Sequence, residues 1–228
     1  VHAAMIDRMD REIGRVLREI EEAGQLDDTL VVFLSDNGAS AEIMVRGDGH
    51  DPEATPGSAS TYLCLGPGWS TVANTPFRRH KTWVHEGGIS TPLIMSWPKG
   101  LGAAGETRGT AAHLIDLHAT LLDLAGVRSP SAGSEAPPPP GCSLRETLVR
   151  DAPLDRGWLW WCHEGNRAVR VGDWKLVAAK GEPWELYDLA TDRSEGDDVS
   201  AAHPEKVREM AALWQRRMDE FAAAAKPR

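Results

Sequence analysis

The most informative stretch of the chain is Thr29-Leu-Val-Val-Phe-Leu-Ser-Asp-Asn-Gly38. In it, an unbroken apolar run rich in β-branched residues ends in an acid, an amide and a glycine. Such a run predicts a strand buried on both faces, as in parallel sheets covered by helices. Open sheets of this kind bind ligands beyond the carboxyl ends of their strands, where Asp36 and Asn37 fall. A carboxylate beside an amide oxygen suits a hard divalent cation such as calcium. A simple turn is the alternative interpretation, since Asn-Gly is a strong turn signal.

Apolar patterns on either side of this strand predict an α/β layer protein. An amphipathic helix is predicted from the start of the chain to about Glu22, with Gly24 ending it. Pro92-Leu-Ile-Met-Ser-Trp97 predicts a second buried strand, and a helix that covers the sheet is predicted over residues 111–124. Residues 39–74 show no apolar period, which is typical of a functional or disordered connection.

The character of the sequence changes after residues 129–141, a proline-rich stretch that we interpret as a linker or exposed excursion. Short aromatic and β-branched runs separated by turn residues then predict an antiparallel sheet. Its strands are expected at residues 158–161, 168–171, 174–177 and 184–187. A last amphipathic helix, from about Pro204 to Phe221, is predicted to cover one face of this sheet.

The overall composition limits the classes of partner. With 25 Lys and Arg against 34 Asp and Glu, the formal charge of −9 argues against a nucleic acid or an anionic membrane surface as partner. No apolar run approaches the ~20 residues of a membrane span. Cys64, Cys142 and Cys162 form neither a CxxC pair nor an even disulfide set, so they do not indicate a compartment. Because Val1 already belongs to a helical pattern, we expect the chain to be the carboxyl-terminal part of a longer protein.

A second motif, Asn74-Thr-Pro-Phe-Arg-Arg-His-Lys-Thr-Trp-Val-His-Glu-Gly-Gly88, places a cationic cluster before a double glycine. A lysine beside a bound cation supplies a second compact positive charge, and a hydrogen-bond donor, for an anionic ester. The double glycine lets the backbone turn tightly or approach a ligand closely. A solvated basic loop is the alternative, and the motif alone does not decide between the two.

Taken together, the motifs resemble a known family. Ser35-Asp-Asn-Gly38, Lys81 and His85-Glu-Gly-Gly88 are similar to the carboxyl half of the type I sulfatases. These are the calcium-dependent, formylglycine-bearing arylsulfatases of the alkaline phosphatase superfamily. The ordered resemblance covers nearly the whole chain, from the opening helix through Pro92–Pro98, His163–Arg170, Trp174–Val177 and Glu185–Leu189.

The resemblance implies an α/β fold with a partial alkaline-phosphatase-like sheet and covering helices, followed by a small antiparallel sheet plus a C-terminal helix. It implies that residues 1–128 belong to the catalytic domain, that residues 129–141 form the linker, and that residues 142–228 form a C-terminal subdomain. It also implies a periplasmic or secreted enzyme that acts on a small-molecule or carbohydrate sulfate ester.

By the same resemblance, Asp36 and Asn37 are calcium ligands and Lys81 contacts the sulfate and the leaving-group oxygen. As the S–O bond breaks, negative charge moves to the departing oxygen, and preplaced cations in a dry site stabilise it. His85 and His163 are expected to contact the substrate, with a structural role for His85 as the alternative.

The sequence also departs from the family pattern. The family nucleophile is a formylglycine made from Cys or Ser within Cys/Ser-x-Pro/Ala-x-Arg, and none of the three cysteines lies in that context. The family's amino-terminal aspartate pair is absent, and two ligands fall short of the about six to eight oxygens that calcium takes. We therefore expect a sulfatase fragment that is inactive by itself. The alternatives are a fragment of a phosphate or phosphonate ester hydrolase of the same superfamily, or a non-catalytic remnant that binds a partner through its aromatic sheet.

Overall fold

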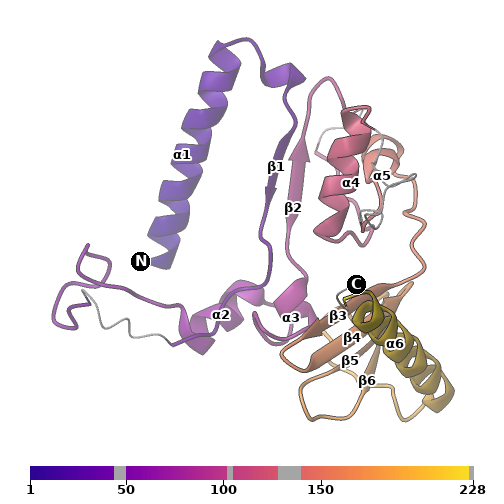
Figure 1. The fold of residues 1–228 in the computed structure, drawn as a ribbon. Helices are drawn as coiled ribbons and strands as arrows, with labels where there is room; N and C mark the ends of the chain where they lie inside the picture. The colour runs from indigo at the N-terminus through magenta and orange to yellow at the C-terminus, as the bar shows by residue number, and fades with distance from the viewer. Residues whose placement is uncertain (44–49, 102–104, 128–139, 226–228) are drawn as a thin grey trace. The chain divides into compact units, whose positions relative to one another are not determined.

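The computed structural model describes residues 1–43, 50–101, 105–127 and 140–225 of the chain. The chain divides into two compact units. The first unit combines residues 1–7, 35–92 and 157–228, and the second combines residues 8–34 and 93–156. Helices and strands of an α/β protein, together with the small antiparallel sheet and the C-terminal helix, confirm the predicted fold class (Figure 1).

The second unit contains a two-stranded ladder, β1 (Val31–Leu34) and β2 (Leu93–Ser96). Both strands occur where the sequence predicts them, but they run antiparallel, and Phe33 and Ile94 stay exposed. The prediction of a parallel strand covered on both faces is therefore wrong for the described residues. Apolar and β-branched residues favour a strand, but the direction of its neighbour depends on long-range pairing that the local sequence does not encode.

Helix α1 (His2–Glu22) ends as the sequence predicts. Gly24 has φ +69°, and its N–H donates to the Glu21 carbonyl oxygen at 2.8 Å. The Gln25 N–H donates to the Ile20 carbonyl oxygen at 3.0 Å. This pair of bonds is the Schellman motif, which a glycine in the left-handed region allows. A short 3₁₀ turn, η1 (Leu26–Asp28), then leads into β1.

The described part of the second unit also contains the helices α4 (Ile115–Leu124) and α5 (Arg145–Arg150). Buried polar groups of α4 hold the segment that leads into α5: the Asp116 carboxylate accepts the Cys142 N–H at 2.9 Å, and the Thr120 hydroxyl accepts the Leu144 N–H at 2.9 Å. Helix α4 lies inside the predicted span of 111–124. Most of the predicted linker 129–141, namely residues 129–139, lies outside the described residues.

The first unit contains a four-stranded antiparallel sheet in the order β3 (Leu159–His163), β4 (Asn166–Val171), β5 (Trp174–Ala178) and β6 (Glu185–Asp188). Each strand pairs with the next along the chain, as predicted. The β3–β4 turn consists of Glu164 and Gly165, both with positive φ, which suits a two-residue hairpin turn.

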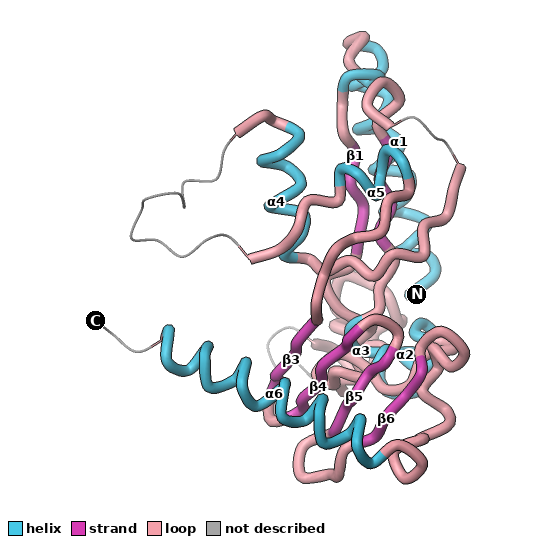
Figure 2. The backbone as a smooth tube through the Cα atoms, turned by 90° about the vertical axis from the view of Figure 1, so that its right-hand side faces the viewer, coloured by secondary structure: helices cyan, strands magenta, loops and turns pink. Residues whose placement is uncertain are grey.

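Side chains alternate between the two faces of this sheet and build two apolar clusters. On one face, Val169, Leu176 and Leu186 pack against Met210 and Trp214 of α6 (Pro204–Ala224), which crosses the strands (Figure 2). On the other face, a second cluster contains Ala168, Val177, Tyr187, Leu189 and Val84, with Ile89 and Trp161 packed against it. The sheet therefore has α6 on one side and the segment around α3 (Glu86–Ile89) on the other.

One more helix of the first unit, α2 (Gly66–Asn74), falls inside the stretch that the sequence left without a predicted element. Residues 44–49 of that stretch lie outside the described residues. In the described part of the chain, no helix has the length and apolarity that crossing a bilayer requires.

Candidate functional site

Asp36 and Asn37 lie in a tight turn directly after β1. The Ser35 hydroxyl donates a hydrogen bond to the Asn37 carbonyl oxygen at 2.8 Å, and the Thr91 hydroxyl donates to the Ser35 carbonyl oxygen at 2.7 Å. These bonds fix the backbone while Asp36 stays exposed and Asn37 half-buried. A turn and a pair of ligands are therefore compatible at these two residues.

Gly38 brings this turn against the double glycine of the second motif. The Gly38 N–H donates to the Gly88 carbonyl oxygen at 2.9 Å. A Cβ atom at Gly38 would lie 1.8 Å from the Gly87 carbonyl oxygen. Because only glycine permits such a close approach of two backbones, the sequence at both motifs is adapted to this contact.

Lys81 takes part in the same contact between the two motifs through its backbone. Its backbone N–H donates to the Ala39 carbonyl oxygen at 3.1 Å, and the Ala39 N–H donates to the Asn74 side-chain oxygen at 2.9 Å. Lys81 itself is exposed. We call residues 35–39 and 78–88 the paired loops, because backbone hydrogen bonds join them although helix α2 lies between them in the sequence.

Helix α2 also contacts residues 78–88, which carry Lys81 and which we call the lysine segment. The hydroxyl of Ser70, which is fully buried, lies 2.8 Å from Nδ1 of His80, the residue before Lys81. The Asn74 amide donates to the Arg79 carbonyl oxygen at 3.2 Å. The backbone that carries Lys81 is thus held from α2 and from the Asp36 turn.

The donor set at the turn can be compared with what calcium needs. Within the described ranges, no group of three or more His, Cys, Asp or Glu side chains is arranged to hold a metal ion. Asp36 and Asn37 offer oxygen donors of the kind that calcium prefers, but only two of the about six to eight that it takes. These residues fit a partial calcium site and not a complete one. Their ligand roles, and the sulfate contact of Lys81, stay predictions.

His85 is buried and points to the sheet. Its Nε2 atom lies 3.2 Å from Glu185 Oε2. Burial, together with the positive charges of Lys175 and Arg78, lowers the pKa of His85 to about 4, although Glu185 acts in the opposite direction. His85 is thus neutral at pH 7. This environment favours the structural role that the sequence left open, and a substrate contact by His85 stays a prediction.

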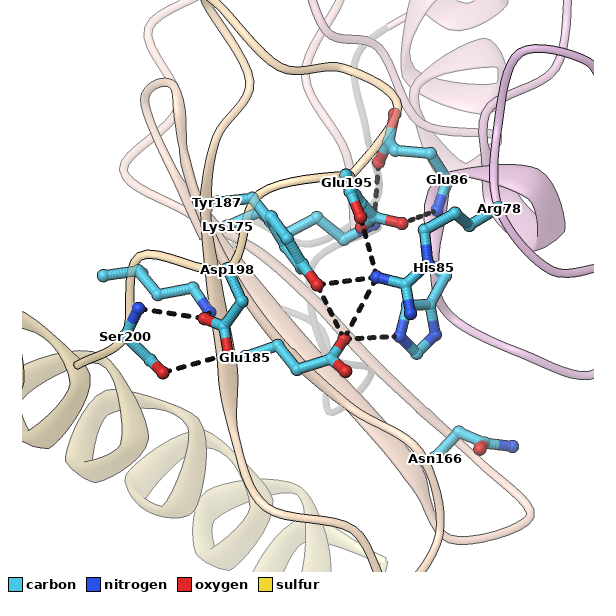
Figure 3. A network of polar contacts seen from close by, with 12 residues as sticks. Arg78, His85, Glu86, Asn166, Lys175, Glu185, Tyr187, Glu195, Asp198 and Ser200 are labelled. Atoms are coloured by element: carbon cyan, nitrogen blue, oxygen red, sulfur yellow. Dashed lines mark hydrogen bonds and ion pairs between the residues drawn. The ribbon is translucent and has the colours of Figure 1, made fainter. Parts of the chain in front are cut away.

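A buried ion-pair network joins the paired loops to the C-terminal sheet (Figure 3). The Lys175 ammonium lies 2.7 Å from Glu86 Oε1 and 2.8 Å from Glu195 Oε1, and all three residues are buried. Glu195 Oε2 also accepts the Glu86 N–H at 2.9 Å. Burial raises the pKa of Glu195, while the Lys175 ammonium acts to lower it.

Arg78 forms the second half of this network. One of its terminal nitrogens donates to the Tyr187 hydroxyl at 2.6 Å and to the Glu195 carbonyl oxygen at 2.7 Å. The Tyr187 hydroxyl in turn donates to Glu185 Oε2 at 2.9 Å, the same oxygen that faces His85. Both ends of the lysine segment are therefore bonded to side chains of β6 and the loop after it.

No individual role is predicted from the sequence for the five partners Glu86, Lys175, Glu185, Tyr187 and Glu195. For Lys175 the sequence carries only a weak signal: it lies two residues before Val177 in β5, so the two side chains share one face of the strand. A lysine on an apolar face needs a partner for its charge there. No comparable local signal marks Glu195, which has a left-handed backbone with φ +57° in an irregular loop.

His163 lies at the exposed end of β3. Its Nε2 atom is 4.0 Å from Glu164 Oε1. The Asn166 amide donates to the carbonyl oxygens of Thr82 and His163, both at 3.1 Å, so the β3–β4 hairpin contacts the residue after Lys81. The structure brings the backbone of His163 toward the lysine segment, while a substrate contact by its ring stays a prediction.

Comparisons with known proteins found one family model that spans both motifs and several similar proteins. A family model described as Sulfatase matches residues 1–127. An uncharacterized sulfatase of Schizosaccharomyces pombe is 30% identical over 241 residues, which cover 94% of this chain and 42% of that protein. An arylsulfatase of Klebsiella aerogenes is 33% identical over 141 residues, which cover 56% of this chain and 29% of that protein. The chain therefore spans less than half the length of these curated relatives.

A solved structure shares the fold. It is described as a complex with its substrate, D-glucosamine-2-N,6-O-disulfate, and it matches 95% of this chain and 39% of its own with a TM-score of 0.63 and 23% sequence identity. At this identity, the likeness shows a common fold.

Proposed function

Because this chain belongs to the sulfatase family, we propose that its 228 residues form the carboxyl-terminal part of a calcium-dependent sulfatase that hydrolyses sulfate monoesters. The observation that carries the proposal is the backbone pairing of residues 35–39 with residues 78–88, which joins the acid–amide turn to the lysine segment. The matching family model extends across both motifs.

Lys81 would bind the anionic ester and stabilise its leaving oxygen. An ammonium group is a compact positive charge with three donors, which suits a sulfate oxygen. Negative charge grows on the bridging oxygen as the S–O bond breaks, and a cation fixed in advance stabilises it without reorganising solvent. The exposed position of Lys81 on a firmly held backbone supports this role.

Asp36 and Asn37 would contribute two oxygen ligands to calcium, with the other ligands supplied by the part of the full-length sulfatase that carries the family's aspartate pair. Bound calcium would offset the negative charge of the sulfate oxygens. The formylglycine nucleophile has no counterpart among the 228 residues, since no Cys or Ser here lies within the Cys/Ser-x-Pro/Ala-x-Arg pattern. We therefore propose that the chain alone does not turn over sulfate esters.

A sulfated carbohydrate is the substrate class that we propose. The solved structure of the same fold that was described above contains a sulfated sugar. In this chain, Tyr62 and Trp69 lie exposed in the stretch between the two motifs and offer flat apolar surfaces of the kind on which a sugar ring packs.

The test uses the full-length sulfatase that contains these residues, assayed with an aryl sulfate and a sulfated sugar. Lys81→Ala should lower kcat/KM by about 10²- to 10³-fold, because the leaving oxygen loses its cation. Lys99→Ala is the matched control: it removes another exposed ammonium, paired with Asp28 on the surface, and should change kcat/KM by no more than about twofold.

Asp36→Ala, tested in the same protein, should weaken calcium binding in a calorimetric titration as well as lower the rate. Near-normal turnover by a folded Lys81→Ala protein would remove the lysine from the mechanism, and unchanged calcium affinity in Asp36→Ala would remove the ligand. Faster turnover of a phosphonate ester than of either sulfate ester would favour the phosphate or phosphonate hydrolase instead.

A further inference from the structure

Lys175 is a charged side chain inside the protein. It is fully buried, on the face of the C-terminal sheet that packs against residues 84–89, whereas its strand neighbours Trp174 and Leu176 face α6. Burying an ammonium is costly unless it is paired and hydrogen-bonded. Since Lys175 is shielded from any ligand, its effect on a site must pass through the groups that it holds.

The ammonium holds one carboxylate from each of two separate segments (Figure 3). Glu86 belongs to the paired loops, and Glu195 belongs to the loop after β6; their nearest oxygens lie 2.7 and 2.8 Å from the Lys175 nitrogen. Glu195 closes the triangle, because its other oxygen accepts the Glu86 N–H at 2.9 Å. Lys175 therefore holds Glu86 directly through its side chain and indirectly through its backbone.

Glu86 has little freedom to move without its neighbours. It is followed by Gly87, where a Cβ atom would lie 2.2 Å from the Arg78 carbonyl oxygen. The next residue, Gly88, accepts the N–H of Gly38, which directly follows the predicted calcium ligands. A displacement of Glu86 is thus transmitted through main-chain contacts to the Asp36 turn.

We infer that Lys175 is a positioning residue: it holds the paired loops in the arrangement that presents Lys81 beside the Asp36 turn. The catalytic consequence rests on the proposed function, whereas the loosening of the loops without Lys175 does not. Two carboxylates share one ammonium in this triangle. Removing the ammonium leaves both carboxylates buried without the cation that they contact, and the loops would have to open so that water can reach them.

The test measures hydrogen–deuterium exchange by mass spectrometry on the 228-residue chain. Lys175→Met keeps an unbranched side chain that is one atom shorter, and it removes the charge. Exchange in peptides that cover residues 35–39 and 78–88 should become about tenfold faster, while α6 keeps its protection. The control is Lys206→Met, since Lys206 lies over the Trp174 ring on the α6 side of the same strand, with its nitrogen 4.9 Å from the ring centroid. It should leave the paired loops unchanged.

Unchanged exchange in the paired loops of a folded Lys175→Met chain would overturn the inference. An equal loss of protection in α6 would also overturn it, because it would indicate general unfolding. Where Lys175→Met does not fold, Glu86→Gln serves as the second variant: it leaves Lys175 and Glu195 as a neutral pair and weakens only the hold on the loop. Exchange at residues 78–88 should still be faster, and unchanged exchange would count against the inference.

Enzyme kinetics provide a second test that is independent of the exchange experiment. In the full-length enzyme, Lys175→Met should lower kcat by about tenfold and move KM less, because a displaced lysine stabilises the transition state less well. Normal kcat in Lys175→Met beside a large loss in Lys81→Ala would overturn the positioning role alone. Normal turnover in Lys81→Ala would overturn the proposed role of Lys81 and leave the exchange result standing.

Discussion

His85 and His163 are two histidines that the sequence placed in the same class, as candidate substrate contacts. The structure separates them by environment. His85 is buried against Glu185 and near the charges of Lys175 and Arg78, while His163 is exposed at the end of a strand. Residue type made both histidines candidates, but only the tertiary contacts show that His85 is buried beside Glu185.

The environment of His85 predicts a pH dependence of stability. Burial lowers the pKa of His85 to about 4, below its ordinary value of 6.5. Between these two pH values the unfolded chain binds a proton that the folded chain excludes, so stability from this group is present above pH 6.5 and is lost as the pH falls toward 4. The full loss should reach about 3 kcal/mol. Chemical denaturation at a series of pH values measures it.

His85→Gln is the comparison for this experiment, since glutamine does not titrate. The difference in unfolding free energy between the two proteins should shrink as the pH falls from 6.5 to 4. Glu195, whose pKa burial raises, contributes with the opposite sign, but it is present in both proteins and largely cancels from the difference. A difference that is constant with pH would contradict the pKa assigned to His85.

Among the helices and strands, the local sequence predicted the strands of the C-terminal sheet to within about two residues. Alternation of apolar side chains and turn residues with positive φ are local signals, and they agree here with the final packing. The partner of β1 was not predictable in the same way, because pairing direction is a long-range property. Helix α2 was missed because glycine and proline lower its helix propensity; Ser70 and Asn74 tie it to the lysine segment instead.

The packing of α6 on the sheet predicts how stability is distributed. Trp214 stacks on Trp160 with ring centroids 5.5 Å apart, meets Trp184 edge-on, and donates its indole N–H to the Trp161 carbonyl oxygen at 3.0 Å. Trp214→Ala should lower the free energy of unfolding by about 3–5 kcal/mol, because it leaves a cavity between helix and sheet. Denaturant unfolding followed by circular dichroism gives this value.

Trp69→Ala is the matched control, since Trp69 is 65% exposed whereas Trp214 is 9% exposed. It should change the unfolding free energy by less than about 0.5 kcal/mol. Equal effects of the two substitutions would mean that α6 does not supply the packing that the sheet needs.

Across the full chain, the sequence predicted which segments carry chemistry but not which contacts hold them in place. The acid–amide turn and the lysine loop were found as motifs, and family resemblance placed them together. The triangle of Glu86, Lys175 and Glu195 joins residues that are about ninety and twenty positions apart, so no local pattern could reveal it. The contacts that hold a site in place come from distant parts of the sequence, even where the site residues themselves form short motifs.

The residues present and absent in the chain predict how it behaves when it is tested alone. The 228 residues hold a lysine and two candidate calcium ligands on a firm backbone, but no Cys or Ser in the context that yields formylglycine. Without a nucleophile, cations can bind a sulfate ester but cannot open a covalent route for its cleavage. The purified chain, supplied with calcium, should therefore release no sulfate from an aryl sulfate or a sulfated sugar above the level of its own Lys81→Ala variant. Ion chromatography of released sulfate measures this directly, and turnover that depends on Lys81 would show that a nucleophile is present within these residues after all.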